Sequence, residues 1–259
     1  MILMIRASIW QWDRHKQKEV YIASMQQRLL APVQDLQDLL SQNSNLSELL
    51  HRRAWVKGNF DFAHEILIRN RKLDDMPGTH VLTPLKLENS DLRILVNRGF
   101  IPLAFSDKNQ RHRFQREAPG KIPVLLKESA QLKWLAPADP PAGPPHPWVD
   151  AWLRPNLPEI QKQMPYQILS IYGELMPGNQ DQLKSEDLIS DTSGREELLV
   201  MGLKSINDQK LLSPEELRKY PLPAHDTVIS PGRHFGYVFE WAFMALMTFL
   251  IGVVLQLKR

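Results

Sequence analysis

The residues best suited to chemistry lie near the C-terminus, in the segment RHFGYVFEW, residues 233–241. In a helix that turns by about 100° per residue, His234 and Trp241 fall within about 20° of each other, with Tyr237 between them in the sequence. An imidazole beside aromatic rings at a membrane boundary is suited to axial ligation of haem iron. The alternative is an interfacial histidine held by water and lipid headgroups. The residue types alone favour this second interpretation.

The segment that would position these residues is FGYVFEWAFMALMTFLIGVVLQL, which carries a single ionisable group, Glu240. As a helix its 23 residues would span about 34 Å, enough to cross a hydrocarbon core of about 30 Å. Aromatic side chains crowd its first turns, as is typical of a membrane–water interface. The pattern predicts a C-terminal transmembrane helix over residues 234–257.

One face of this predicted helix is suited to contact with another helix. Ala245, Thr248 and Gly252 continue the face of His234, and small residues allow helices to approach closely. Glu240 is costly in lipid, so we expect it to be paired, protonated or turned towards a cavity. Arg233, seven residues earlier, can reach towards it. Functional and structural roles for Glu240 stay open.

The N-terminal segment MILMIRASIWQW, residues 1–12, is also apolar apart from Arg6, Ser8 and Gln11. It is too short to span a bilayer. It lacks the basic start and the small-residue cleavage site of a signal peptide. We interpret it as the remnant of a first transmembrane helix. The alternative is an amphipathic segment that lies on the membrane surface.

The chain between these segments is predicted to form an extramembrane domain over residues 13–233. Apolar residues recur at helical steps through residues 13–53, and the period changes to two over residues 54–173. Two alternating runs, joined by the polar link at residues 88–91, predict an antiparallel hairpin over residues 80–99. Further strands are expected in HEILIRNR, KIPVLLKES and YQILSIYG. The predicted fold class is an α+β membrane protein, in which transmembrane helices, the first truncated, flank an antiparallel β-rich sheet or small barrel.

Two polar or proline-rich stretches interrupt this pattern. Residues 137–158 hold eight of the 20 prolines, a composition that favours extended backbone and forbids helix. This stretch is either a linker or an ordered wrap anchored by Trp148 and Trp152. Residues 174–220 are expected to form a polar loop region. In it, a short helix should begin at Pro214, capped by Ser213 with Glu216 completing a capping box.

Composition and motifs exclude several classes of function. A net charge of +3 with scattered basic residues does not indicate nucleic-acid binding, and the absence of cysteine excludes thiolate chemistry. His64 and Glu65 are adjacent, but no second histidine follows at the spacing of a zinc helix. No phosphate-binding glycine loop or nucleophile elbow is present. We therefore expect no catalytic residue. Asn97-Arg98-Gly99 is most simply a turn, although Arg98 there could meet a carboxylate or a haem propionate.

Three segments in this order resemble the surfeit locus one family of cytochrome c oxidase assembly factors. They are WQWDRHKQK, the stretch from Gly58 to Pro102, and PGRHFGYVFEWAFMAL. The matching positions are Trp10, Gln11, Arg14, Lys18, Gly58, Phe60, Pro77, Gly78, His80, Thr83, Pro84, Leu95, Val96, Asn97, Arg98, Gly99, Pro102, His234, Tyr237 and Trp241. The chain departs from the family in its short first helix, its divergent residues 121–129, its long region 174–220, and Glu240.

The resemblance implies a protein with two membrane helices that assists delivery of haem a to oxidase subunit I. It implies that His234 is the axial ligand of the haem iron and that Tyr237 and Trp241 contact the ring, which favours haem over the headgroup interpretation. Arg98 and Arg233 are then expected to pair with charges. The implied partners are subunit I, other oxidase assembly or haem a synthesis proteins, and membrane lipid.

The implied location is the bacterial plasma membrane with the domain in the periplasm, or alternatively the mitochondrial inner membrane. The absence of a transit peptide favours a bacterium. Two rival interpretations stay open. One is a membrane-anchored scaffold that stabilises nascent subunit I without binding haem. The other is a tail-anchored protein with one helix and a cytoplasmic domain of unrelated function.

Overall fold

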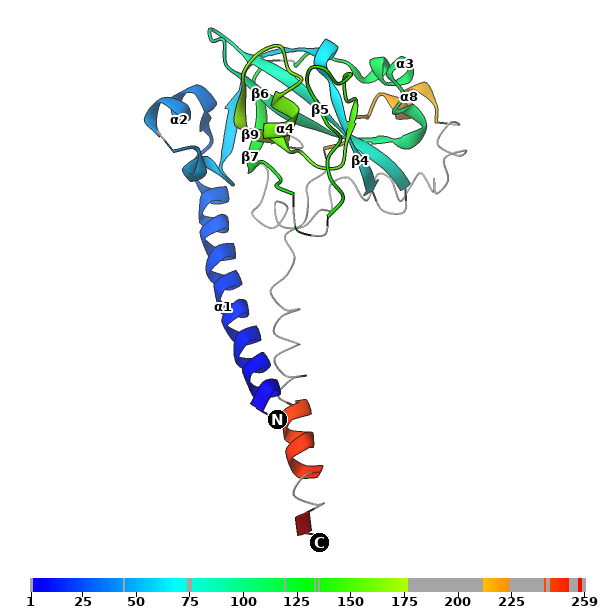
Figure 1. Cartoon of the computed structure of the whole chain (residues 1–259). Coiled ribbons are helices and arrows are strands. Elements are labelled where there is room, and N and C mark those ends of the chain that lie inside the picture. Colours follow the sequence, from blue (N-terminus) through cyan, green and yellow to red (C-terminus); the bar gives the residue numbers. More distant parts are fainter. Residues whose placement is uncertain are drawn as a thin grey trace. The chain divides into compact units, whose positions relative to one another are not determined.

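The computed structural model describes residues 2–43, 45–73, 76–118, 120–132, 134, 136–176, 212–223, 240, 243–251 and 256–257. The chain forms two compact units. One combines residues 1–27 with residues 228–259, and the other comprises residues 28–227. Figure 1 shows the chain coloured from the N-terminus to the C-terminus. The second unit is a sheet-rich domain with short helices, as the change of sequence period at residue 54 predicts.

The first unit contains most of helix α1 (Ile2–Leu30), which joins the predicted remnant to the first part of the helical region predicted over residues 13–53. The rest of that region is not one helix, because a short strand at Gln34–Asp35 and two short helical segments follow Leu30. In the C-terminal part of the first unit, residues 243–251 are helical. Of the predicted helix over residues 234–257, positions 234–239, 241–242 and 252–255 lie outside the described residues. Within the part of the chain that is described, no helix is both long enough and apolar enough to cross a membrane.

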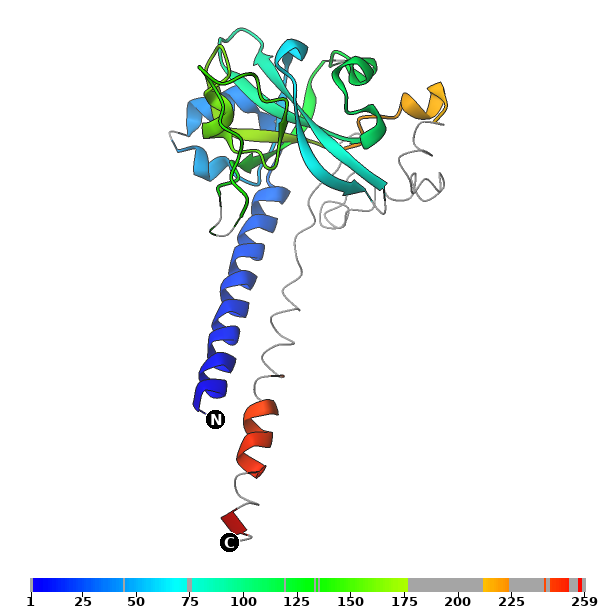
Figure 2. The same cartoon turned by 45° about the vertical axis from the view of Figure 1, so that its right-hand side comes forward.

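Nine strands make up the sheet of the second unit. They are β1 (Gln34–Asp35), β2 (Arg53–Val56), β3 (Gly58–Phe60), β4 (Ile66–Leu73), β5 (Met76–Leu87), β6 (Arg93–Pro102), β7 (Ile122–Glu128), β8 (Ala151–Trp152) and β9 (Ile168–Leu175). Among the described residues of this unit, the helices are α2 (Leu36–Gln42), α3 (Lys108–Arg111), α4 (Leu157–Gln161) and α8 (Pro214–Leu217). The 3-10 turns there are η1 (Leu46–Leu49), η2 (Phe62–His64), η3 (Leu103–Phe105) and η4 (His112–Phe114). Figure 2 shows the twist of the long strands.

The predicted hairpin is confirmed as β5 and β6, which pair antiparallel with Lys86 opposite Arg93. Asn89 in the connecting turn has a φ of 55°, a left-handed conformation that asparagine tolerates better than most residues. The strands predicted in HEILIRNR, KIPVLLKES and YQILSIYG are β4, β7 and β9. Local alternation therefore located these elements of the domain.

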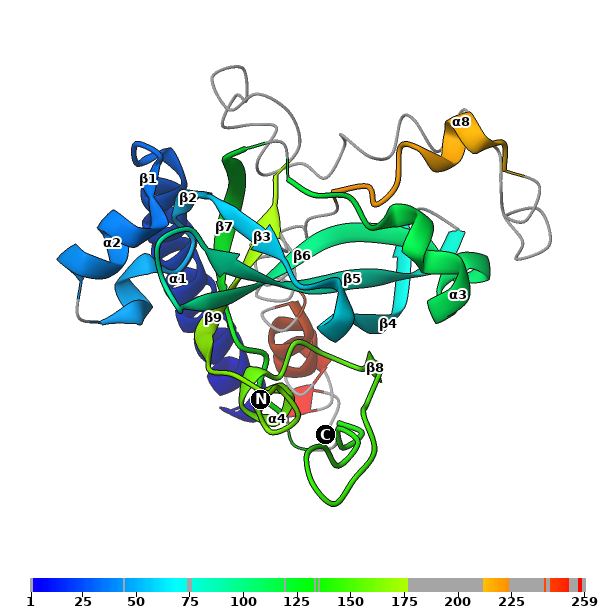
Figure 3. The same cartoon turned by 90° about the horizontal axis from the view of Figure 1, so that it is seen from above.

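The strand pairing closes into a ring, so the predicted small barrel is present. β2 pairs with β7 and β3 pairs with β5, while only Lys57 separates β2 from β3. Because β7, β9, β6 and β5 are neighbours in that order, the path returns to its start through β2 and β3. Figure 3 shows these strands from above.

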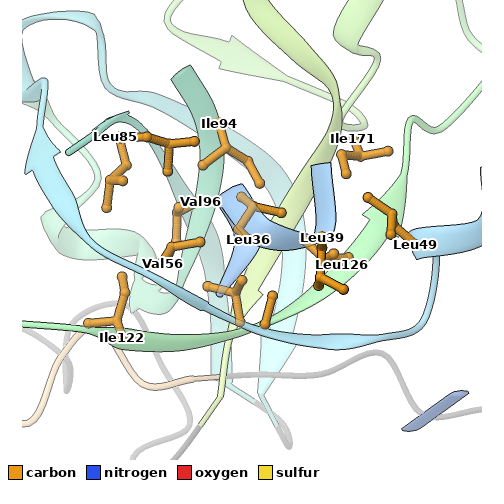
Figure 4. Packing of buried hydrophobic residues seen from close by; sticks show 13 residues of the cluster. Leu36, Leu39, Leu49, Val56, Leu85, Ile94, Val96, Ile122, Leu126 and Ile171 are labelled. Atoms are coloured by element: carbon orange, nitrogen blue, oxygen red, sulfur yellow. The ribbon is translucent and has the colours of Figure 1, made fainter. Parts of the chain in front are cut away.

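The inside of this ring is filled by apolar side chains from the strands and from α2 and η1. Leu36, Leu39 and Leu49 are fully buried and pack with Val96 and Leu126 (Figure 4). α2 is held at its start by Asp35, whose side chain accepts a hydrogen bond from the Gln37 amide at 3.1 Å. Burial of a leucine side chain stabilises a fold by about 1.5–3 kcal/mol. The amphipathic residues predicted as helix thus cap the barrel.

The expectation of an antiparallel sheet is wrong for three pairs of strands. β1–β2, β4–β8 and β6–β9 are parallel. The chain between β6 and β9 runs through residues 103–167, long enough to return to the starting end of the sheet before β9 begins. Hairpin signals in a sequence report only neighbouring strands, so they did not indicate these crossovers.

The proline-rich stretch 137–158 is an ordered wrap. Trp152 is fully buried in β8, which pairs with β4, and Trp148 packs partly buried against the same apolar cluster. The expectation that this composition forbids helix is wrong at its end, because α4 begins at Leu157. Pro158 lies in the first turn of α4, where the amide that proline lacks would have no partner in the helix.

The predicted short helix near residue 214 is confirmed as α8, which begins at Pro214. Residues 177–211 of the predicted loop region lie outside the described residues. After α8, the amide of Leu222 donates to the Phe100 carbonyl at 2.9 Å, and the Phe100 amide donates to the Leu222 carbonyl at 2.7 Å. These hydrogen bonds join residues 212–223 to β6.

Candidate functional site

Of the five predicted cofactor contacts, His234, Tyr237, Trp241 and Arg233 lie outside the described residues. Ligation of haem iron by His234 therefore stays a prediction. Glu240 is described and is exposed. Arg98 is described and lies inside the domain, where its side chain is 5% exposed.

The small-residue face of the C-terminal segment is represented by Ala245. Ala245 is 8% exposed, whereas Met244 and Leu246 on either side are 39% and 54% exposed. Among residues 243–251 it is the buried position. This segment belongs to the same compact unit as residues 1–27 of α1. Thr248 of the predicted face is exposed and Gly252 lies outside the described residues, so packing of this face is seen only at Ala245.

Arg98 occupies an irregular position in β6. Gly99 lies opposite Val81 and Asn97 lies opposite Leu82, so Arg98 is the extra residue of a β-bulge. Gly99 has a φ of 119°, and a Cβ atom there would approach the Leu222 carbonyl oxygen to 2.1 Å. The expectation of a turn at residues 97–99 is wrong, because the glycine serves a bulge and a close backbone contact within a strand.

The Arg98 guanidinium has hydrogen-bond and aromatic partners within the domain. Its Nη1 donates to Glu65 Oε2 at 3.1 Å, and its Nη2 donates to the Phe114 carbonyl. The guanidinium carbon lies 5.3 Å from the centre of the Phe60 ring and 5.2 Å from that of Phe62. Arg98 therefore meets a carboxylate, as one of the two expectations for this residue stated.

Glu65 joins Arg98 to a second buried arginine. Its Oε1 lies 3.1 Å from Nε of Arg111, and its Oε2 accepts a hydrogen bond from the Thr83 hydroxyl at 3.0 Å. Arg111 also donates two hydrogen bonds to the Asp150 carboxylate, at 2.7 and 2.5 Å. The four charges alternate in sign along the network, and the exposed Lys108 adds a further positive charge 3.8 Å from Asp150 Oδ1.

Burial and charge act in opposite directions on the two arginines. Burial lowers the pKa of Arg98, and the adjacent Glu65 carboxylate offsets part of this effect. Burial also works to lower the pKa of Arg111, but the hydrogen bonds and charges of Asp150 and Glu65 outweigh it and raise that pKa. Both groups stay cationic, and each partner left alone would be an uncompensated buried charge.

Three members of this network were not among the site residues predicted from the sequence. Glu65 was considered only as part of a zinc motif, and Arg111 and Asp150 gave no signal. Asp150 lies in the proline-rich wrap, 39 residues after Arg111. The position of Asp150 between Trp148 and Trp152 was a sequence sign that the wrap contacts the barrel through an ion pair.

A second polar cluster lies nearer the surface, around Asp61. Its Oδ2 accepts a hydrogen bond from the Tyr166 hydroxyl at 2.6 Å and lies 2.7 Å from Nδ1 of His64. The His64 ring meets the rings of Trp148 and Tyr166 edge to face, each at 5.5 Å. Burial works to raise the pKa of Asp61, but the hydrogen bonds from Tyr166 and His64 outweigh it and lower that pKa.

Burial and the bond to Asp61 raise the pKa of Tyr166, so its hydroxyl stays protonated and acts as a donor. The arrangement fixes the His64 ring by a carboxylate and two aromatic side chains. Within the described part of the chain, no group of three or more metal-binding side chains is present. The cluster therefore orients a single imidazole and does not form a multi-ligand metal site among these residues.

Comparison with known proteins identifies relatives along most of the chain. The model of the SURF1 family matches residues 1–246. A SURF1-like protein of Monosiga brevicollis is 27% identical over 153 residues, which cover 55% of this chain and 58% of that protein. Surfeit locus protein 1 of Mus musculus is 32% identical over 147 residues, covering 51% of this chain and 47% of that protein.

A bacterial relative is also found. A SURF1-like protein of Rickettsia bellii (strain RML369-C) is 24% identical over 175 residues, covering 66% of each chain. The aligned region spans about half the length of the first curated relatives.

Proposed function

The chain belongs to the SURF1 family, and from this premise we propose that it is a membrane-anchored assembly factor, and not an enzyme, for the haem-copper cytochrome c oxidase of a respiratory chain. It would act as a chaperone that binds haem a at the membrane boundary and assists its insertion into subunit I. The observation that carries this proposal is the family match over residues 1–246, which includes the segment His234–Trp241.

Exposed apolar side chains support attachment to a membrane. Phe243, Phe249 and Ile251 are 62%, 51% and 55% exposed in the described part of the C-terminal segment. A helical segment with such a surface is unfavourable in water unless lipid or another protein covers it. The proposed location is the bacterial plasma membrane with the domain in the periplasm. The mitochondrial inner membrane is the alternative, since relatives occur in both a bacterium and animals.

In this proposal His234 ligates the haem iron, while Tyr237 and Trp241 contact the ring. When bound, the haem would supply an iron that the imidazole of His234 would hold. The side chains would only hold and orient it. A haem propionate needs a cationic partner, and Arg98 already has Glu65 and the Phe114 carbonyl. The pairing of Arg98 therefore favours Arg233 as the partner of a propionate.

The second candidate is a scaffold that stabilises nascent subunit I and binds no haem. The ion pairs inside the domain favour it, because they occupy its buried charged side chains. Glu65, Arg98, Arg111 and Asp150 pair with one another there. Other proposed partners, in both cases, are further oxidase assembly or haem a synthesis proteins and membrane lipid.

Visible spectroscopy separates the two candidates. The full chain, purified in detergent from a host that makes haem a, is expected to show a haem spectrum that His234→Ala abolishes. His146→Ala is the control, since His146 is an exposed histidine in a turn. Absence of haem from the wild-type protein, or a spectrum unchanged by His234→Ala, would contradict haem binding by His234. An oxidase-assembly defect on deletion, with no haem spectrum, would indicate the scaffold.

A further inference from the structure

A basic pocket lies where η4 and the residues after it meet α8. Its lining consists of His112, Arg113, Arg116, Pro214, Leu217 and Arg218, and its volume is about 280 Å³. Figures 1 and 3 show α8 at the same end of the domain as α3, which leads directly into η4. We call this cavity the arginine pocket.

The arginine pocket is built by segments about a hundred residues apart that are fastened to each other. Arg116 Nη1 donates to the Arg218 carbonyl at 2.6 Å. The buried rings of Phe114 and Tyr220, one from each segment, meet edge to face at 6.2 Å. The bridge between Phe100 and Leu222 holds the far end of the second segment. The walls are therefore fixed by packing and hydrogen bonds.

The buried charge network sets the position of η4. Arg98 donates a hydrogen bond to the carbonyl of Phe114, the last residue of η4. Arg111 immediately precedes η4. His112 and Arg113 are thus held between Arg111, which pairs with Glu65, and Phe114, whose carbonyl accepts a hydrogen bond from Arg98. The network therefore fixes the backbone of η4, which carries the exposed side chains of His112 and Arg113.

Charge distinguishes the arginine pocket from a second cavity among the described residues. That cavity, of about 350 Å³, is lined by Lys57, Lys86 and Glu88 among others. There Lys57 pairs with Glu88 at 2.8 Å, and Lys86 pairs with the nearby Asp91 at 3.3 Å. Among the residues that the structure describes, no carboxylate lines the arginine pocket. Its three guanidinium groups carry a formal charge of +3 with His112 neutral.

One of these arginines is already oriented. Arg113 donates from Nε and Nη2 to the carbonyl and side-chain oxygens of Gln110, at 2.9 and 2.6 Å. Its guanidinium carbon lies 5.2 Å from the centre of the Phe105 ring. A guanidinium held in this way loses little rotational freedom when it binds an anion, and its planar fork matches phosphate oxygens.

We propose that the arginine pocket binds a phosphate group, either in a phospholipid headgroup or as a free phosphate. Several guanidinium donors with no lining carboxylate suit a phosphate oxyanion, and Pro214 and Leu217 offer apolar surface beside it. This binding goes beyond the proposed function and does not require haem.

Binding is tested on the full chain in detergent micelles. Inorganic phosphate is titrated by calorimetry, and retention of phosphatidylglycerol against phosphatidylcholine is compared by native mass spectrometry. Arg113→Gln/Arg218→Gln is expected to weaken binding of the recognised probe at least about tenfold, because it removes two positive charges and their charge-assisted hydrogen bonds to the phosphate. Arg69→Gln/Lys72→Gln removes the same charge from exposed positions of β4 and should leave the affinity unchanged within about twofold.

The two binding measurements identify the source of the phosphate. Retention of phosphatidylglycerol with little phosphatidylcholine indicates a lipid headgroup, and binding of inorganic phosphate alone indicates a free phosphate. Failure of both probes to bind, or equal loss in the two double variants, overturns the proposal. If the pocket variant unfolds, Arg218→Gln alone replaces it, since Arg218 is exposed and uses only its carbonyl in the contact with Arg116. The haem spectrum is unaffected by either outcome, so the two proposals fail separately.

Discussion

Arg98 on β6 donates a hydrogen bond to Glu65 at 3.1 Å, and both side chains are buried. The pair lies between the bulge in β6 and the start of β4, and it extends through Arg111 to Asp150. It is the point at which the barrel, the segment after β6 and the proline-rich wrap are joined by charge.

Glu65→Gln is expected to destabilise the domain by about 3–5 kcal/mol, because two buried arginines lose their shared counter-ion. The free energy of unfolding, measured by urea denaturation followed by circular dichroism, checks this value. Glu128→Gln is the matched control, since Glu128 is an exposed carboxylate at the end of β7. A loss no larger than that of the control would show that the network contributes nothing to stability.

Gly99→Ala is expected to cost more than Gly120→Ala, although both glycines have a φ near 120°. Backbone strain of about 1–3 kcal/mol applies to both positions. Only at Gly99 would the new Cβ meet backbone, the Leu222 carbonyl oxygen at 2.1 Å, while at Gly120 no heavy atom lies within 4 Å. Thermal unfolding of the two variants gives the comparison. Equal losses would mean that residues 212–223 can shift away from β6 without cost.

Asp61 is expected to make stability depend on pH in the acidic range. Its pKa in the folded protein is lowered, so its contribution is present above the ordinary aspartate value of about 3.9 and is lost as the pH falls through the folded pKa. The free energy of unfolding of wild type and Tyr166→Phe should therefore differ at pH 6, and the difference should shrink below the ordinary value. A difference independent of pH would exclude the Tyr166–Asp61 hydrogen bond as its cause.

Glu240→Gln is expected to lower haem retention or oxidase assembly, because an ionisable group in an apolar helix is costly unless a partner or cavity receives it. Glu240 is exposed, whereas Ala245 in the same segment is buried. Gln256→Ala, an exposed polar position further along, serves as the control. The haem spectrum and oxidase activity of membranes provide the readout. Unchanged values would remove Glu240 from the site.

Local patterns in the sequence predicted much of the barrel. Alternation located β4, β5, β6, β7 and β9, and the polar link 88–91 paired β5 with β6. Pro214 marked the start of α8. Each of these signals lies within about a dozen residues, because strand alternation, turn chemistry and helix starts depend on near neighbours. The resemblance to the family also arose from the sequence, and the family match confirms it.

Only the tertiary structure decided which distant residues meet. The parallel pairing of β6 with β9, the ion pairs from Arg98 to Asp150 and the joining of η4 to α8 all connect residues far apart in the chain. Arg98 in the sequence was consistent with a turn, a carboxylate or a propionate. In the folded domain Arg98 pairs with the Glu65 carboxylate. A buried charge is costly unless an opposite charge lies beside it, and packing places Glu65 there.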